Sequence, residues 1–457
     1  MMEHIEELCR YAINSALQLG ADEVEVYAQD EIEMSLSIKR NEIRETQFFS
    51  DRGLGIRVVV GKRLGFAYTN DLRREKIEET AKNAISLARA RKPDNDWAGF
   101  PVSKKYPNVE GLYDKRIESI DANDVIEVAR ALLDSALDYD PRIVFAMGGV
   151  GVDRVKRFIF NTNGISAIDK GTFAFLYSGL IAREGENVSP LSIELDVSRS
   201  FKLNPTEVSQ ACAERAVKSL NAKKIKSGKY DVIFTQYAFS QILEYTLVEA
   251  IKADNVQNNR SPLIGKINQM ILNERLTIID DGTYAGGFSS GKFDDEGVPS
   301  QRTVIFEKGV LKSYLYDNYT AKKFNKESTG NGLRKGSSIG ASIAYTLTPS
   351  IHKTNLIIAP GKASPDELIS EIKEGIIVWN VQGAHSSNPS TGEFSVAAAP
   401  AWKIENGEIA YPVKGALVSD TIFSMLSRDL IIANNLKMDI GYILPWILAR
   451  NVPVACQ

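Results

Sequence analysis

The first half of the chain repeats one pattern, in which a helical stripe of apolar residues is followed by short β-prone runs. In residues 5–19 apolar side chains recur every three to four positions, which predicts an amphipathic helix that Gly20 ends. Runs rich in β-branched residues follow at 24–27, 34–38 and 55–60. A helical stripe and strands return in the centre of the chain. We therefore expect two helix-and-sheet regions in succession.

Two basic segments divide the chain. A second helical stripe ends in the basic residues 89–92 and Pro93, which suit a helix end and a linker. Residues 223–229 form another basic linker, and beyond it tight glycine turns predict hairpins at 303–311 and 402–410. The predicted class is α+β, with a barrel- or sandwich-like, strand-rich C-terminal domain that holds a few helices. The expected regions are residues 1–92, 93–224 and 225–457.

Composition and charge exclude several classes of protein. Lys and Arg total 55 against 58 Asp and Glu, so the formal charge of −3 provides no large field for nucleic acid or an anionic membrane. No apolar stretch approaches the roughly 20 residues of a membrane-spanning helix, and the acidic first helix is unlike a signal peptide. Cys9, Cys212 and Cys456 show no metal-binding or disulfide spacing. A cytoplasmic protein is expected, with Cys212 in the core.

Several motifs resemble the TldD/PmbA peptidase family across nearly the whole chain. The most specific is the run Asp-Asp-Glu-Gly-Val-Pro-Ser-Gln-Arg at 294–302. Others are Gly-Asn-Gly-Leu-Arg at 330–334, the segment 349–361 and Ser-Thr-Gly-Glu-Phe-Ser at 390–395. Near the start, residues 20–26 and 53–58 match the opening of the family.

This resemblance implies a peptidase that is assembled from two related chains. A TldD-type chain carries zinc on an HExxxH helix with a distant Cys ligand, and a PmbA-type chain pairs with it and helps to enclose an unfolded peptide. Zinc catalysis of this kind needs imidazole ligands, an open position for water and a glutamate base. The resemblance therefore implies that zinc is held by the partner, and we expect no cofactor in this chain.

The helix at the position of the zinc motif departs from the family pattern. Glu244 and Glu249 occupy the two histidine positions, and Tyr245 occupies the position of the base. The two carboxylates lie roughly 140° apart on a regular helix, so one ion could bind both only if the helix were distorted. We expect glutamates that face solvent or the peptide chamber, beside a buried stripe that includes Phe239, Ile242, Leu243 and Leu247.

A few other side chains are candidates for the peptide chamber. His385 and Ser386 lie in a small polar loop before a predicted strand, although His385 is more simply a turn residue. Asp294 and Arg302 belong to the most specific family motif. The serines lack the Gly-x-Ser-x-Gly elbow of a serine hydrolase, and the remaining histidines, His4 and His352, bring no second nitrogen ligand.

Three functions stay open on sequence grounds. The favoured one is a PmbA-type subunit that forms a heterodimer with a TldD-type relative and binds unfolded peptide. The second is a self-sufficient metallopeptidase that uses Glu244, Glu249 or His385 around an unusual metal. The third is a homodimeric peptide-binding protein without catalysis. Each of the three predicts peptide as the ligand, and none involves nucleic acid or a membrane.

Overall fold

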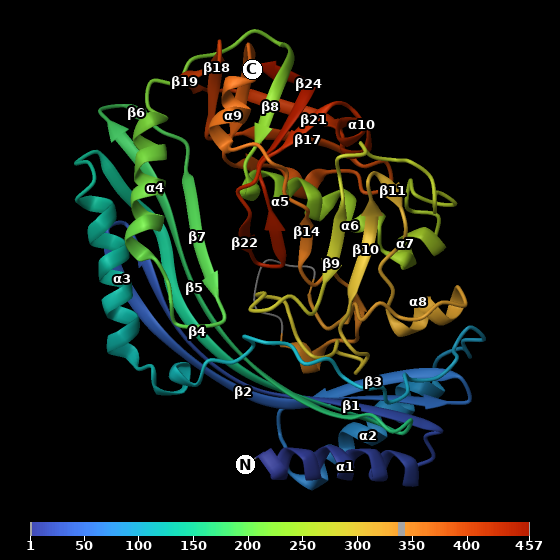
Figure 1. Ribbon diagram of the computed structural model, residues 1–457. Coiled ribbons are helices and arrows are strands. Elements are labelled where there is room, and N and C mark those ends of the chain that lie inside the picture. The colour runs from blue at the N-terminus through green and yellow to red at the C-terminus, as the bar shows by residue number, and fades with distance from the viewer. Residues whose placement is uncertain (1, 337–342, 457) are drawn as a thin grey trace.

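The computed structural model describes residues 2–336 and 343–456, and it confirms the α+β class. One long, curved sheet from the first half of the chain faces a strand-rich part formed by residues 228–456 (Figure 1). We call the latter the C-terminal part. Within the described residues, no helix has both the length and the apolar character needed to cross a membrane.

Four unusually long antiparallel strands form most of the curved sheet. Its strand order is β3-β2-β1-β4-β5-β6, and β7 also pairs with β5. The Asn163-Gly164 pair, a sequence that predicts a tight hairpin turn, joins β4 to β5, and Gly164 has the positive φ of +92° that such a turn favours. The strands are β1 (Glu23–Lys39), β2 (Glu42–Val60), β3 (Arg63–Thr69), β4 (Ile143–Asn161), β5 (Ser166–Glu184), β6 (Asn187–Val188) and β7 (Ser192–Ser198).

Two helix pairs cover opposite ends of the same face of this sheet. Side chains alternate between the faces of a strand, and in β1 the even-numbered Val26 packs with α1 and α2, while Leu36 packs with α3 and α4. The odd-numbered Glu25 and Tyr27 point to the other face, toward the C-terminal part. The helices are α1 (Met2–Gln18), α2 (Arg74–Arg89), α3 (Ala122–Leu137) and α4 (Pro205–Lys218), and a 3₁₀ turn, Lys115–Ser119, precedes α3. Both pairs therefore lie on the convex side (Figure 1).

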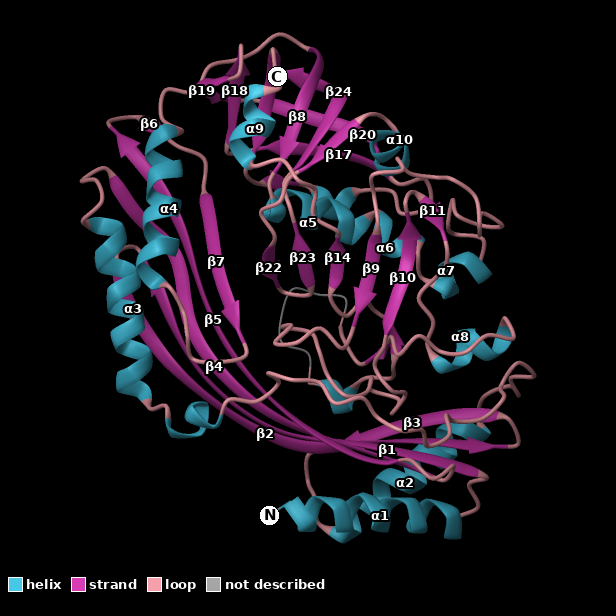
Figure 2. Ribbon diagram, viewed as in Figure 1, coloured by secondary structure: helices cyan, strands magenta, loops and turns pink. Residues whose placement is uncertain are grey.

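The C-terminal part contains two main sheets (Figure 2). One has the order β16-β17-β20-β24-β8-β15-β18-β19, with β21 pairing to β24, and the other has the order β11-β10-β9-β14-β23-β22. The strands of the first are β8 (Gly228–Phe234), β15 (Glu374–Val378), β16 (Val381–Gln382), β17 (Glu393–Ala398), β18 (Ala401–Glu405), β19 (Glu408–Val413), β20 (Ala416–Thr421), β21 (Leu430–Ile432) and β24 (Ile447–Cys456). Those of the second are β9 (Ile278–Asp281), β10 (Arg302–Glu307), β11 (Val310–Leu311), β14 (Leu356–Ile358), β22 (Lys437–Asp439) and β23 (Tyr442–Leu444). A small pair, β12 (Gly332–Leu333) and β13 (Ser350–Ile351), lies outside both.

Short helices connect the strands of the C-terminal part. They are α5 (Gln236–Tyr245), α6 (Leu247–Ala250), α7 (Ala253–Gln257), α8 (Asn318–Lys323), α9 (Pro365–Ser370) and α10 (Ile422–Ser427), with 3₁₀ turns η2 (Ala344–Thr346) and η3 (Ala384–Ser386). The β10–β11 and β18–β19 hairpins confirm the predicted ones. A buried apolar cluster lies between the two sheets and includes α5 and α6.

Candidate functional site

The helix at the position of the zinc motif is divided in two. α5 begins after Thr235, where β8 ends, and the chain leaves helical geometry at Thr246, with φ −126° and ψ −83°, before α6. The Thr246 hydroxyl donates a hydrogen bond to the carbonyl of Ile242 at 2.6 Å. A threonine that bonds back to the preceding turn bends a helix. The helix at the position of the zinc motif is therefore interrupted between Glu244 and Glu249.

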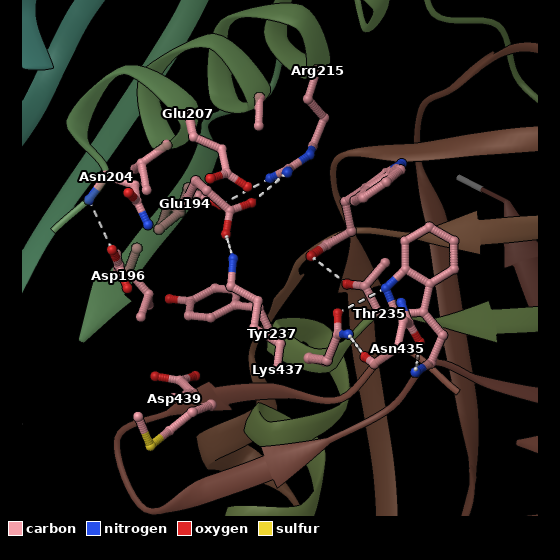
Figure 3. Close-up of a pocket in the computed structure, with 18 of the residues that line it drawn as sticks. Glu194, Asp196, Asn204, Glu207, Arg215, Thr235, Tyr237, Asn435, Lys437 and Asp439 are labelled. Carbon is pink, nitrogen blue, oxygen red and sulfur yellow. Dashed lines mark hydrogen bonds and ion pairs between the residues drawn. The ribbon is translucent and has the colours of Figure 1, made fainter. Parts of the chain in front are cut away.

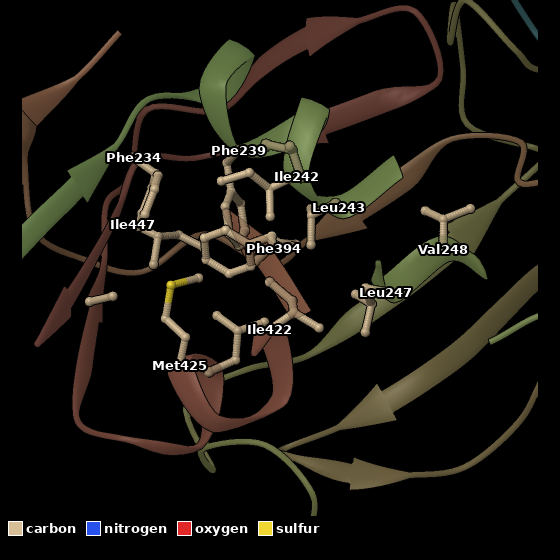
Figure 4. Packing of buried hydrophobic residues seen from close by; sticks show 14 of the residues in the cluster. Phe234, Phe239, Ile242, Leu243, Leu247, Val248, Phe394, Ile422, Met425 and Ile447 are labelled. Carbon is tan, nitrogen blue, oxygen red and sulfur yellow. The ribbon is translucent and has the colours of Figure 1, made fainter. Parts of the chain in front are cut away.

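The apolar side of α5 and α6 fixes how their polar side chains point. Phe239, Ile242 and Leu243 of α5 and Leu247 of α6 are fully buried, as predicted. They pack against side chains from other strands and helices of the C-terminal part (Figure 4), including Phe394, Ile422, Met425 and Ile447. This packing leaves Glu244 and Glu249 at the margin of the core.

Glu244 is held by Tyr442 of β23 and by Lys353, which lies in the loop between β13 and β14. The Tyr442 hydroxyl donates a hydrogen bond to its carboxylate at 2.5 Å, and Lys353 Nζ lies 3.4 Å away. The same ammonium lies 3.8 Å from the centre of the Tyr442 ring. Partial burial opposes ionisation, but Lys353 and the Tyr442 hydroxyl outweigh it and lower the pKa of Glu244. Glu244 is therefore an ionised carboxylate that already has a counter-ion.

Glu249 has a different set of partners. Lys252 Nζ lies 2.5 Å from one carboxylate oxygen, and the Asn255 side-chain amide donates to the other at 3.1 Å. Tyr245, at the position of the family's base, packs against the margin of the apolar cluster. Each glutamate therefore has its own lysine.

These residues do not fit a zinc ion. Zinc in proteins prefers imidazole and thiolate donors, whereas α5 and α6 offer two carboxylates and a phenol at the motif positions. Both carboxylates are already neutralised by ammonium groups. A cation at either carboxylate would have to displace a lysine before it could bind.

Two further residues beside Glu244 were not among the predicted site residues. His352 lies next to Lys353, and burial together with the positive charges of Lys252 and Lys335 lowers its pKa to about 3. Lys335 is accessible to solvent, yet the protein around it and the nearby Lys353 lower its pKa to about 8. Three lysines and a neutral imidazole thus surround the divided helix. The sequence signals near them were the family-like segment 349–361, which contains His352 and Lys353, and the motif 330–334, which Lys335 follows directly.

Asp294 is buried away from this cluster. One of its carboxylate oxygens accepts hydrogen bonds from the backbone N–H groups of Glu296 and Val298, at 3.0 and 2.9 Å, and the other accepts from Gly332 at 2.9 Å. Burial and the nearby Glu296 raise its pKa well above the ordinary value. Asp294 thus holds together the loop that contains the most specific family motif.

The rest of that motif joins the C-terminal part to the curved sheet. Arg57 binds Glu25 through two hydrogen bonds, at 2.8 and 2.6 Å, and reaches Glu296 at 3.2 Å. Arg334 donates to Glu25 at 2.6 Å. All four side chains are at least nine-tenths buried. We call Glu25, Arg57, Glu296 and Arg334 the junction network, and their contacts indicate a structural role.

The remaining predicted residues lie on the surface. His385 and Ser386 are exposed on η3, which follows β16 and adjoins α5. Arg302 is exposed at the start of β10, opposite Asp281 of β9. Within the described ranges, no hydrogen bond or ion pair links Asp294 or Arg302 to Glu244. The structure therefore places only His385 and Ser386 beside the divided helix.

Comparison with known proteins agrees with this geometry. Sequence models of the PmbA/TldA metallopeptidase family match residues 24–88 (domain 1), 115–220 (central domain) and 227–456 (C-terminal domain). An uncharacterized protein from Methanocaldococcus jannaschii is 32% identical over 406 residues, which span 89% of this chain and 90% of the relative. Metalloprotease PmbA of Escherichia coli O157:H7 is 28% identical over 95% of this chain and 93% of its own.

A solved structure shows the same fold. The crystal structure of TldE from Thermococcus kodakarensis superimposes with a TM-score of 0.91, over 99% of this chain and 100% of that one, at 28% sequence identity. The three family domains together match well over half of the chain. This chain belongs to the TldD/PmbA family of metallopeptidases.

Proposed function

We propose that this chain is the PmbA-type subunit of a two-chain peptidase, in which a TldD-type relative carries zinc and this chain helps to enclose an unfolded peptide. The observation that carries the proposal is the pairing of Glu244 with Lys353 and of Glu249 with Lys252. Lysine ammonium groups neutralise the carboxylates at the positions where the zinc-bearing chain holds a metal. The negative charge of Glu244 and Glu249, which would otherwise attract a metal ion, is thereby balanced by lysines of the same chain.

The position of η3 supports a role in peptide binding. β16 is an edge strand of its sheet, and η3 follows it directly. An edge strand offers main-chain N–H and C=O groups to any extended peptide, which gives binding with little sequence preference. His385 and Ser386 would then contact the side chains of the peptide, while the divided helix would form the adjacent wall.

The free cysteines Cys9 and Cys212 are buried, which supports a reducing, cytoplasmic setting.

The experiment measures bound metal and peptide cleavage for two preparations. One is the purified chain alone, and the other is the chain co-expressed with a relative that contains HExxxH. Zinc and cleavage of an unstructured peptide in the second preparation only would support the subunit role. Stoichiometric metal and chelator-sensitive cleavage by this chain alone would support the self-sufficient metallopeptidase instead, and peptide binding without a partner or cleavage would support the homodimeric binding protein.

Substitutions at the divided helix refine this test. Glu244→Ala and Glu249→Ala should leave the activity of the complex within about tenfold of the unmodified complex, equivalent to about 1.4 kcal/mol of barrier. An exposed carboxylate far from the helix, Asp134 on α3, provides the matched control as Asp134→Ala. A loss of several orders of magnitude for either glutamate, with none for the control, would show that the glutamates take part in catalysis.

A further inference from the structure

A cavity of about 260 Å³ lies between the concave face of the curved sheet and the C-terminal part. One wall consists of β4 and β5 around Val155 and Phe173, and the other includes the loop 288–290 and Ile440, at the turn between β22 and β23. Lys335 also lines it, and the charges of Lys353 and Glu244 both act on this lysine. The cavity therefore adjoins the Glu244 cluster. We call it the β4–β5 pocket.

Cations outnumber carboxylates in this pocket. Arg157 contacts both carboxylates of the lining, with its Nη1 3.1 Å from Asp295 and its Nη2 3.3 Å from Asp169. Three other cationic side chains line the pocket, and they form no ion pair within the described ranges. They are Lys170, Arg199 and Lys335. The pocket therefore carries positive charge that no carboxylate of its own lining balances.

Arg199 is the most buried of these cations. It is 5% exposed, and its hydrogen bonds go to backbone carbonyl oxygens only, in the part of the chain that the structure describes. Its guanidinium lies over the Phe173 ring, and a Cβ on the pocket-lining Gly171 would come within 2.8 Å of its Nη1. Burial and the charge of Arg157 lower its pKa. Buried charges are ordinarily paired, so an anion in the pocket would stabilise this side of the sheet.

Lys335 and an apolar surface remain accessible in the same pocket. Lys335 is exposed, while Ile440 is 57% exposed and Phe288 is half-buried. The Phe288 ring meets the edge of the Phe173 ring, with 5.1 Å between their centres. An accessible ammonium group beside apolar side chains suits an anion that bears an apolar group.

A larger cavity of this chain differs in its charge balance. It has a volume of about 480 Å³ and lies between β7 and β22 (Figure 3). Its two cations, Arg215 and Lys437, both contact the carboxylate of Glu194. Positive charge in that cavity is therefore already balanced within the chain. The excess of cations distinguishes the β4–β5 pocket as the place for an anion.

We propose that the β4–β5 pocket binds the carboxylate end of a peptide whose last residue is apolar. The carboxylate contacts Lys335 and is further stabilised by the charges of Arg157 and Arg199, while the apolar side chain lies against Phe288 and Ile440. The pocket is smaller than drug-sized sites, which span roughly 300 to 1,000 Å³, so it admits the last residue rather than a longer segment. This inference rests on the proposed function, because its ligand is the end of the peptide that the chain helps to enclose.

Calorimetric titration of the purified full chain tests the proposal with four probes: N-acetyl-Ala-Leu, its C-terminal amide, N-acetyl-Ala-Gly and inorganic phosphate. We expect N-acetyl-Ala-Leu to bind with a dissociation constant below about 1 mM. The amide lacks the negative charge and should bind at least about tenfold more weakly. Glycine in place of leucine removes the apolar side chain and should weaken binding at least about threefold. Phosphate should bind more weakly than N-acetyl-Ala-Leu, because it has no apolar group.

Substitutions at Lys335 locate the site. Lys335→Met removes the charge from a side chain of similar length and should raise the dissociation constant of N-acetyl-Ala-Leu at least about tenfold. Lys335→Arg keeps the charge and should retain binding. Lys82→Met, at an exposed position on α2, is the matched control and should leave the affinity unchanged. Thermal unfolding of each variant verifies that it is folded.

Several results would overturn the proposal. They are equal binding of the acid and the amide, equal binding of the leucine and glycine peptides, phosphate binding as tight as that of N-acetyl-Ala-Leu, no heat up to millimolar peptide, and unchanged affinity in Lys335→Met. The titration needs neither zinc nor a partner. Zinc-dependent cleavage by the co-expressed complex without carboxylate binding by this chain would therefore reject the pocket and keep the subunit role, and the converse result would reject the subunit role alone.

Discussion

The junction network and the cluster around Glu244 both combine carboxylates with cations, but they differ in burial and in the completeness of their pairing. In the junction network every side chain is at least nine-tenths buried, Arg57 bridges Glu25 and Glu296, and Arg334 binds Glu25. The Glu244 side chain is 41% exposed, with one lysine at 3.4 Å. Enclosed arginine–carboxylate networks join parts of a fold, whereas partly open lysine–carboxylate pairs can exchange partners. The difference indicates which charges belong to the architecture and which remain available for function.

Removal of Arg334 should have the largest effect. Arg334→Met leaves Glu25 buried with one of its partners lost, and breaking a buried ion pair costs about 3 to 5 kcal/mol. Urea unfolding followed by circular dichroism measures the loss. Arg302→Met, at an exposed position on β10, is the control and should change the free energy of unfolding by less than about 0.5 kcal/mol. Equal effects of the two variants would remove the distinction between the two regions.

The hydroxyl of Tyr442 should contribute less. Tyr442→Phe removes the donor to Glu244 without changing the shape of the side chain, and Lys353 keeps the carboxylate paired. A hydrogen bond to a charged group contributes about 1.5 to 3 kcal/mol, and we expect the lower end because Glu244 is partly solvated. The same urea unfolding measures it. A loss as large as that of Arg334→Met would place Glu244 in the architecture of the fold.

Acid should destabilise the fold through His352. Its folded pKa of about 3 lies below the unfolded value of 6.5, so at pH 5 only the unfolded chain takes up the proton. Stability from this group is therefore present above pH 6.5 and is lost as the pH falls toward 3. Between pH 7 and 5 we expect a loss of about 1 kcal/mol, after allowance for partial exposure. His352→Gln should lose correspondingly less over the same interval, and an unchanged pH dependence would contradict the assignment.

The pair of Glu249 and Lys252 should contribute least. Lysine and glutamate three residues apart near the surface stabilise a protein by about 0.2 to 0.5 kcal/mol, and the Glu249 side chain is 30% exposed. Glu249→Gln keeps the hydrogen bond with Asn255 and removes only the charge. Urea unfolding in low and high salt should show a small difference that salt removes. A cost above about 2 kcal/mol would place Glu249 with the junction network.

Local patterns in the sequence predicted several elements correctly. The helical stripe at 5–19, the Asn163-Gly164 turn and the burial of Cys212 on α4 are confirmed. A signal of the same kind begins α9, where the Ser364 side chain forms a capping box with Glu367. Each of these signals lies within a few residues, where side-chain chemistry and backbone conformation are directly linked.

Other features depend on contacts between distant parts of the chain. The length of β1 was not apparent, because Asp30 lies on the face that otherwise carries apolar side chains and, with Gln29 and Glu31 beside it, interrupts the apolar alternation. Nothing in the local sequence marks Thr246 as the point where the helix is interrupted, because the interruption depends on the hydrogen bond from its hydroxyl to the Ile242 carbonyl. The partner of Glu244 is Lys353, and no local pattern connects two residues so far apart in sequence. Pairing of this kind is decided by tertiary packing.

The central position of β1 in the curved sheet also sets the timing of its folding during synthesis. β1 lies between β2, which follows it at once, and β4, whose pairing residues are made about a hundred residues later. At a translation rate of about 5 to 20 residues per second, β1 waits roughly 5 to 20 seconds for that neighbour. During this interval its inner edge has unpaired backbone groups, and such edges recruit other chains. The nascent β1–β2 hairpin is thus the segment on which we expect a ribosome-associated chaperone to act.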